Sequence, residues 1–204
     1  MIAIINYGSG NVQAIANIYH KLSIPHVITD KEEELRAASK LVLPGVGAFD
    51  EVMARLNESG LREILDELVL EKKIPVIGVC VGMQILAESS EEGEIDGLGW
   101  INGTVKKIDV SNLLHKPHLP HMGWNVATPI RSHSLLENLD IDKGFYFLHS
   151  YCFHCNEEED ALMATDYGEK ITSAVNHDNI FGTQFHPEKS HGNGIQIFKN
   201  FANL

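Results

Sequence analysis

Cysteine is scarce in this sequence, whose 204 residues include three cysteines, Cys80, Cys152 and Cys155. An odd and sparse set argues against the framework of disulfide bonds that stabilises many small secreted proteins. The opening residues MIAIINYGSGN also lack the basic, apolar and cleavable regions of a secretory signal. We therefore expect a cytoplasmic protein.

Positive charge and long apolar runs are also in short supply. The chain has 16 Lys and Arg against 28 Asp and Glu, for a net charge of -12, and its basic residues are scattered. A nucleic-acid-binding protein usually gathers basic residues on one face. No apolar run approaches the ~18 residues that a membrane-spanning helix needs. We therefore expect neither nucleic acid nor a membrane as a partner, and we expect the acidic run SSEEGEIDG to be a solvated loop.

The remaining composition is typical of one globular domain, residues 1–204, because 44% hydrophobic residues allow a sizeable core. In the first half, the short apolar runs MIAIINY, KLVLPG and IPVIGVC alternate with segments of helical spacing. This alternation indicates parallel strands joined by crossover helices. From Gly99 the pattern is mostly strand and loop, and GNGIQIFKNFANL at the end is again helical. We predict an α/β fold with a mixed, mostly parallel central sheet flanked by helices.

Cys80 stands between two glycines in PVIGVCVGMQILAES. PVIGV has the character of a buried strand and MQILAES that of the first turns of a helix, so Cys80 is expected at a strand-to-helix turn. Gly78 and Gly82 would let the strand and the helix approach closely, as in the elbow that presents the nucleophile of many hydrolases. The helix N-terminus would lower the pKa of the thiol, and the Val81 N–H would point towards an oxyanion. For this motif alone, a buried structural cysteine is an equally good interpretation.

A candidate partner for the cysteine occurs in IFGTQFHPEKSHG, where an apolar strand is predicted to end at His186, Pro187 and Glu188. Alternation along an extended backbone puts His186 and Glu188 on the same side, and Pro187 favours that backbone for the residue before it. A histidine oriented by a carboxylate, with a cysteine elsewhere in the chain, supplies base, orienting group and nucleophile. We predict that Cys80, His186 and Glu188 are catalytic.

A third element is the turn PGVG, Pro44 to Gly47, which follows the predicted strand KLVL. Backbone N–H groups in a glycine-containing turn can bind an anion. Val46 or Gly47 is therefore a candidate for a second oxyanion donor beside Val81. A plain turn before a helix is the better interpretation of this stretch when it is taken alone.

With these motifs located, the chain resembles the class I (triad) glutamine amidotransferases, through PGVGAF, GVCVGMQ and QFHPEKS. It is more closely similar to the glutaminase subunits of imidazole glycerol phosphate synthase, through NYGSGN, PHMGWN and FLHSY, and the resemblance runs nearly from end to end. It implies a three-layer fold, hydrolysis of L-glutamine through a γ-glutamyl thioester, and neither cofactor nor metal. It also implies a heterodimer with a HisF-type (β/α)8 barrel cyclase, which uses the ammonia to make imidazole glycerol phosphate in histidine biosynthesis.

The resemblance further assigns roles that the motifs alone do not. Five residues would hold the glutamine, three of them by their backbone: Gly45, Gln84, His149, Ser150 and Tyr151. Four residues would contact the cyclase: Asn11, Met122, Trp124 and Lys189. The resemblance also implies that the isolated subunit is nearly inactive until a liganded partner reshapes the Pro44 to Gly47 strand.

Two other functions remain open at this point. His191 after HPEKS, followed by GNGIQIFKNF, is similar to a paralogous group that works with a HisF-like barrel. That group feeds ammonia to an amidine-forming enzyme of surface-polysaccharide synthesis, so the acceptor would be a sugar. A non-catalytic binding module on the same scaffold is the second alternative, which the presence of Cys80, His186 and Glu188 does not favour.

A metal or redox site is a weaker interpretation of two further stretches. Cys152 and Cys155 in CFHC match half of a zinc site or a thioredoxin-type pair, but the sequence has no second cysteine pair. His115, His118 and His121 in LLHKPHLPHM belong to a stretch with two prolines, which is more typical of a surface loop. We therefore predict no metal site.

Overall fold

The computed structural model describes residues 1–114 and 118–204. These residues form one mixed sheet of 11 strands and a separate antiparallel pair. The large sheet has the order β2-β1-β3-β4-β13-β12-β10-β6-β5, while β11 pairs with β12 off this path and β8 pairs with β11. Its strands are β1 (Ile2–Ile5), β2 (His26–Thr29), β3 (Lys40–Gly45), β4 (Val76–Cys80), β5 (Ser89–Ser90), β6 (Gly103–Lys107), β8 (Thr128–Pro129), β10 (Tyr151–Cys155), β11 (Ala161–Tyr167), β12 (Glu169–His177) and β13 (Ile180–Thr183). The separate pair is β7 (His121–Asn125) and β9 (Phe145–His149).

The first half of the chain supplies the parallel part of the sheet, as predicted. β2, β1, β3 and β4 pair in parallel, and β13 returns to pair in parallel with β4. The later strands β12 and β10 continue the sheet in antiparallel fashion. Every residue of β4 is buried, which explains why this strand is an unbroken apolar run rather than an alternating one. The prediction of an α/β fold with a mixed sheet is confirmed.

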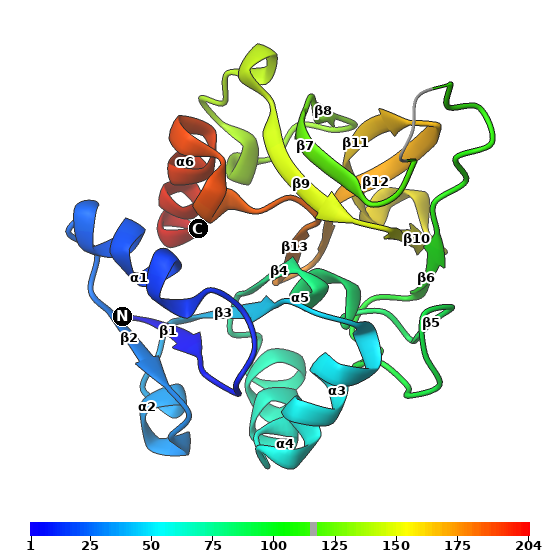
Figure 1. Cartoon of the computed structure of the whole chain (residues 1–204). Coiled ribbons are helices and arrows are strands. Elements are labelled where there is room, and N and C mark those ends of the chain that lie inside the picture. The colour runs from blue at the N-terminus through cyan, green and yellow to red at the C-terminus, as the bar shows by residue number, and fades with distance from the viewer. Residues whose placement is uncertain (115–117) are drawn as a thin grey trace.

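Helices cover both faces of the parallel strands, with α1 and α6 on one side and α3 and α4 on the other (Figure 1). In α1, Ile15, Ile18 and Tyr19 are buried, and the Asn11 side chain caps the first turn by accepting a hydrogen bond from the Ala14 N–H at 3.4 Å. No helix formed by the described residues has the length and apolar character needed to cross a membrane. The helices are α1 (Val12–Lys21), α2 (Glu32–Arg36), α3 (Phe49–Glu58), α4 (Arg62–Asp66), α5 (Val81–Gln84) and α6 (His191–Asn203).

Two predicted elements near Cys80 and His186 are wrong in their extent. The helix expected over MQILAES is the single turn α5, because the carbonyl groups of Ile85 and Leu86 accept hydrogen bonds from N–H groups of residues 98, 100 and 101 instead of continuing the helix. The strand expected to reach His186 ends at Thr183, and Pro187–Lys189 form a 3-10 turn. A proline at the first position of such a turn is favourable, since its missing N–H would have had no partner there.

The acidic run at residues 89–97 is not simply a solvated loop. The Asp50 carboxylate accepts hydrogen bonds from the N–H groups of Glu94 and Ile95, at 2.9 and 3.1 Å. Oε2 of Glu92 accepts from the Phe49 N–H, at 2.9 Å, and so caps the N-terminus of α3. The run is therefore hydrogen-bonded to α3 through one carboxylate of the helix, Asp50, and one of the run itself, Glu92.

Gly82→Ala should destabilise this fold strongly. A Cβ at residue 82 would lie 2.0 Å from the carbonyl oxygen of Leu43, a backbone atom that cannot move without displacing β3. We expect urea denaturation to show a loss of about 3 kcal/mol or more in the free energy of unfolding.

Gly192→Ala is the matched control. Gly192 lies near the start of α6, and a Cβ there would meet nothing within 4 Å. It should leave the free energy of unfolding unchanged or raise it by up to ~1 kcal/mol. Equal effects of the two substitutions would contradict the close approach of α5 to β3.

Candidate active site

Cys80 lies at the junction of β4 and α5 with a φ of 57° and a ψ of -114°. A positive φ is strained for a residue with a Cβ, and such strain is typical of turns that carry a nucleophile. Cβ atoms at Gly78 and Gly82 would lie 2.4 Å and 2.0 Å from backbone oxygen atoms, so both glycines are needed for the approach. The structure thus forms the predicted strand-to-helix turn. Because α5 has only four residues, the thiol faces a shorter helix than the sequence indicated.

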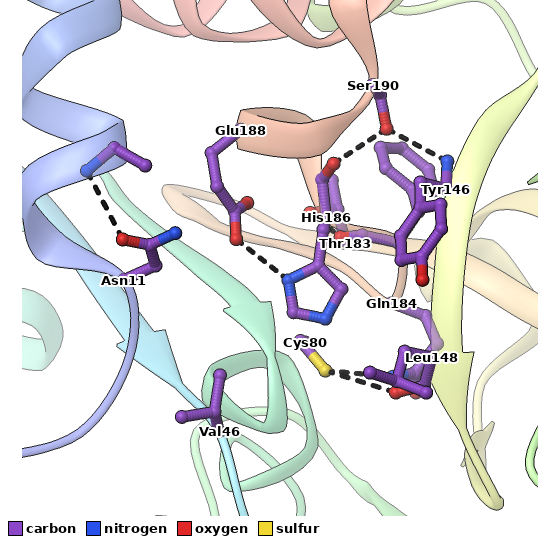
Figure 2. Close-up of polar contacts among 12 residues, drawn as sticks. Asn11, Val46, Cys80, Tyr146, Leu148, Thr183, Gln184, His186, Glu188 and Ser190 are labelled. Carbon is purple, nitrogen blue, oxygen red and sulfur yellow. Dashed lines mark hydrogen bonds and ion pairs between the residues drawn. The ribbon is translucent and has the colours of Figure 1, made fainter. Parts of the chain in front are cut away.

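His186 faces Cys80 and is held from two sides (Figure 2). Its Nδ1 lies 2.8 Å from Oε1 of Glu188, and the two side chains are only 3% and 2% exposed. Oγ of Ser190 donates to the His186 carbonyl at 2.6 Å and accepts from the Tyr146 N–H at 3.0 Å. With Nδ1 bound to Glu188, Nε2 is left on the side of Cys80. Ser190 was not among the predicted site residues, and its only signal is its place in HPEKS.

The surroundings favour a positively charged His186. Burial lowers the pKa of the imidazole, but hydrogen bonds with Cys80 and Glu188 outweigh burial and raise that pKa to about 10. An imidazolium beside a thiolate is the reactive form of a cysteine nucleophile. Sγ of Cys80 also contacts the Leu148 carbonyl oxygen at 3.9 Å and Nε2 of Gln184 at 4.0 Å. The thiol therefore has polar neighbours besides His186.

Cys80 and His186 open into a cavity of about 430 Å³, a volume suited to a small molecule. The cavity brings together several predicted site residues from different elements. Its lining consists of Val46, Gly47, Cys80, Val81, Glu92, Pro120, Leu148, His149, Ser150, His186 and Lys189. Glu92, Pro120 and Leu148 were not predicted from the sequence.

Gly45, Gln84 and Tyr151, which the resemblance assigns to glutamine binding, do not line this cavity. Nε2 of Gln84 donates to the Tyr151 carbonyl at 2.9 Å and to Oε1 of Gln184 at 3.0 Å. Gly45 packs against α5, since a Cβ there would lie 2.4 Å from the backbone nitrogen of Gly82. These residues support the cavity wall from behind.

The N–H of Val46, one of the two candidates for a second oxyanion donor, is bound elsewhere in this structure. The Val46 N–H donates to Oγ of Ser9 at 3.0 Å, and Oγ donates back to the Val46 carbonyl at 3.1 Å. A single N–H that is bound to Ser9 cannot at the same time bind an oxyanion at Cys80. In the same N-terminal loop, the Tyr7 hydroxyl donates to the Pro44 carbonyl. The loop NYGSGN therefore holds the PGVG strand, a role that the sequence did not indicate.

The four residues expected at a partner interface are all exposed, and one of them also has a structural role. Met122 and Trp124 on β7 are 63% and 50% exposed. Nζ of Lys189 lies 5.5 Å from the centre of the Tyr146 ring, and Lys189 also lines the cavity. Asn11 is exposed and caps α1, so its hydrogen bond to Ala14 already accounts for it locally.

One group of potential metal ligands occurs among the residues that the structure describes. Ligand atoms of Cys152, His154 and Glu169 lie within 4.8 Å of one another. Cys155 is three residues from Cys152 on β10 and packs against the main core, so the two cysteines of CFHC do not share one site. A zinc site would need at least one further ligand or a water beside these three. His115, which was weighed as a ligand, lies outside the described residues.

Comparisons with known proteins agree with this geometry. A family model described as glutamine amidotransferase class-I matches residues 3–204. The chain is 53% identical to the imidazole glycerol phosphate synthase subunit HisH of Leptospira interrogans and 50% identical to that of Bdellovibrio bacteriovorus, with 100% of each chain covered in both pairs. A solved structure titled glutamine amidotransferase has a TM-score of 0.72 at 18% identity, over 100% of this chain and 99% of the other.

The chain therefore belongs to the class-I glutamine amidotransferase family, and the fold expected for that class is confirmed. Within the family it groups with the HisH subunits, the glutamine amidotransferase subunits of imidazole glycerol phosphate synthase.

Glu188→Gln should lower the pKa of His186, because the substitution removes the negative charge that stabilises the imidazolium. The wild-type pKa of about 10 exceeds the ordinary 6.5, so the interaction contributes stability below pH 6.5 that is lost as the pH rises through about 10. An NMR titration of the His186 ring protons measures the change. Glu92→Gln, at another carboxylate of the cavity, is the control; a His186 pKa that is equal in both variants would show that Glu188 does not stabilise the charged ring.

Proposed function

We propose that this chain hydrolyses L-glutamine to glutamate and ammonia, with Cys80 as nucleophile, His186 as proton carrier and Glu188 as its orienting group. One observation carries the proposal. A strained cysteine meets a buried histidine–carboxylate pair at one cavity, in a chain of the class-I glutamine amidotransferase family. Residues 1–204 act together as a single catalytic domain.

The reaction proceeds in two halves. The Cys80 thiolate attacks the side-chain amide carbon, and the negative charge on the carbonyl oxygen is stabilised by the Val81 N–H and, once it has turned, an N–H of Val46 or Gly47. His186 gives its proton to the nitrogen as the C–N bond breaks, so ammonia leaves and a γ-glutamyl thioester remains. Water then attacks the thioester, His186 takes up a proton, and glutamate leaves with the thiolate restored.

The glutamine lies against the cavity wall formed by the backbone of His149 and Ser150. Gln84 supports this wall through its hydrogen bond to the Tyr151 carbonyl. Gly45 contributes by allowing the PGVG strand to approach α5.

A partner must receive the ammonia, because in bulk water most of it would become ammonium, which is not a nucleophile. We assign this part to a HisF-type (β/α)8 cyclase that forms a heterodimer with this chain. Exposed apolar side chains support a docking face at the cavity mouth: Val46 and Leu148 line the cavity and are 46% and 36% exposed. Met122 pairs with Leu148 across β7 and β9, and Trp124 is half exposed on the same strand. Such a patch is typical of an interaction site, where tryptophan is a frequent anchor.

Imidazole glycerol phosphate synthesis, in histidine biosynthesis, is the use of the ammonia that we favour, because the relatives at 53% and 50% identity are named as subunits of that synthase. All three cysteines are free thiols, which fits a reducing compartment such as the cytoplasm.

Cys80→Ala should abolish glutamine hydrolysis and leave the fold and the partner affinity unchanged. We would measure glutamate release by the chain alone and with the HisF-type cyclase of the same organism plus its ribotide substrate. Strong stimulation of the wild type supports the histidine pathway, whereas Cys80-dependent hydrolysis without stimulation points to the sugar-amidine paralogue. Undiminished hydrolysis by Cys80→Ala, or by His186→Asn, would remove that residue from the mechanism.

Ser9→Ala should raise the glutaminase rate of the chain without a partner. The substitution removes the acceptor that binds the Val46 N–H, so this donor can turn towards Cys80 more easily. Loss of one hydrogen bond, worth about 1 kcal/mol, should raise the basal rate about five-fold. Ser9→Thr keeps the hydroxyl and should behave as wild type; a basal rate that does not rise in Ser9→Ala, or rises equally in both, would show that Ser9 does not restrain the strand.

A further inference from the structure

Two buried histidines lie between the exposed face of β7 and the cavity wall, and the proposed mechanism does not use their side chains. His121 on β7 and His149 on β9 are 3% and 7% exposed. Nδ1 of His121 lies 3.0 Å from Nε2 of His149, and Nδ1 of His149 lies 2.8 Å from the Tyr151 carbonyl oxygen. At the other end, Nδ2 of Asn125 lies 3.2 Å from Nε2 of His121. The three contacts form a continuous row from Asn125 to Tyr151.

The direction of every hydrogen bond in this row is fixed from its two ends. The Tyr151 carbonyl can only accept, so Nδ1 of His149 carries the hydrogen and its Nε2 must accept. Nδ1 of His121 is then the donor between the rings. Oδ1 of Asn125 accepts from the Val126 N–H at 2.8 Å, which orients the amide so that Nδ2 donates to Nε2 of His121. A proton added to either ring would set two donors against each other, so both imidazoles must be neutral.

The environment of the rings agrees with this assignment. His121 is stacked against Phe147 and Tyr167, with ring centres 4.6 and 3.9 Å away. Burial, with the neighbouring His149, lowers the pKa of His121 to about 3. Burial also lowers the pKa of His149 to about 4, with a further contribution from the charge of His186. The two rings are thus neutral across the physiological pH range, whereas the His186 ring is positively charged.

The row ends on the backbone that forms the cavity wall. The Tyr151 carbonyl accepts both from His149 and from Gln84, so two buried side chains fix the bend between β9 and β10. Leu148 and Ser150 in this bend line the cavity, and the Leu148 carbonyl oxygen lies 3.9 Å from Sγ of Cys80. A shift of the bend would therefore move the surface that faces the nucleophile.

The row begins on the strand that carries the exposed apolar residues. Strand alternation turns His121 inward and Met122 outward, and the pairs His121–His149 and Met122–Leu148 are in register. A partner that presses on Met122 and Trp124 would thus act on the strand that holds His121.

We propose that His121 is a positioning residue, which donates a hydrogen bond to neutral His149 and so holds the Leu148–Tyr151 bend in the shape that binds glutamine and responds to the partner on β7. This inference rests on the proposed glutaminase function for its purpose. The row of hydrogen bonds itself does not depend on that function and can be tested separately.

Nitrogen-15 NMR of the ring nitrogens tests the row in the full chain without a partner. We expect both His121 and His149 to be neutral, with the hydrogen on Nδ1, and not to titrate between pH 5 and 8. The wild-type assignment comes from comparison with His121→Phe and His149→Phe. A hydrogen on Nε2 of either ring, or titration of either ring in this range, would overturn the proposal whatever the activity of the chain.

Kinetics of three His121 variants, saturated with the HisF-type partner, test the positioning role. His121→Phe keeps the aromatic stack but has no donor, and it should raise the KM for glutamine about ten-fold or more, with a smaller change in kcat. His121→Asn loses the stack but places an amide N–H where Nδ1 stood, so the KM should return towards that of the wild type. His121→Gln places its amide one bond further out and should not rescue.

The order of the variants separates positioning from space filling. A purely structural role predicts that His121→Phe is tolerated and His121→Asn is not, so this order, or an equal loss in both, would overturn the proposal. Partner affinity and the free energy of unfolding in urea are measured for each variant, so that the KM values are compared between equally folded and equally saturated complexes. A wild type that is inactive even with its partner would refute the proposed function, while the NMR result would still decide on the row.

Discussion

The contact between the backbones of β3, β4 and α5 is the constraint on which the rest of the site depends. Gly45, Gly78 and Gly82 meet at distances that a Cβ on any of them would violate. For α5 to lie this close, the chain must reverse at Cys80, which therefore takes a positive φ. The buried residues of β4 hold the strained turn in place, so the core positions Cys80, the proposed nucleophile.

The proposed catalytic partners reach Cys80 because of the strand order. β13 pairs in parallel with β4, so the carboxyl ends of these two strands meet at one edge of the sheet, where α/β proteins commonly bind ligands. His186 follows β13 and is fixed by Glu188 and Ser190. The opposite wall is held differently, since the Val46 N–H donates to the Ser9 side chain of the N-terminal loop rather than to a residue of a neighbouring strand. In the proposed mechanism, Cys80 and His186 are therefore held by buried groups, and the Pro44 to Gly47 strand is the part that we expect a partner to rearrange.

Much of the fold and of the candidate site could be predicted from the sequence, because the motifs that indicate them are local. The turn at Cys80 follows from its flanking glycines, and the parallel sheet from the alternation of apolar runs and helical spacing. The contact of His186 with Glu188 was expected for a partly wrong reason, since a 3-10 turn rather than an extended strand brings them together. Ser9 and Val46 are 37 positions apart in the sequence, and His121 and His149 are 28 apart. No local sequence pattern predicts contacts between residues so far apart.

Covalent labelling tests the central claim most directly. The partner complex is treated with a diazoketone analogue of glutamine, with and without an excess of glutamine, and the modified peptides are identified by mass spectrometry. The account predicts a single adduct on Cys80 that glutamine suppresses, with Cys152 and Cys155 unmodified. An adduct on either of those cysteines in place of Cys80, or an unlabelled Cys80 in a complex that is hydrolysing glutamine, would contradict it.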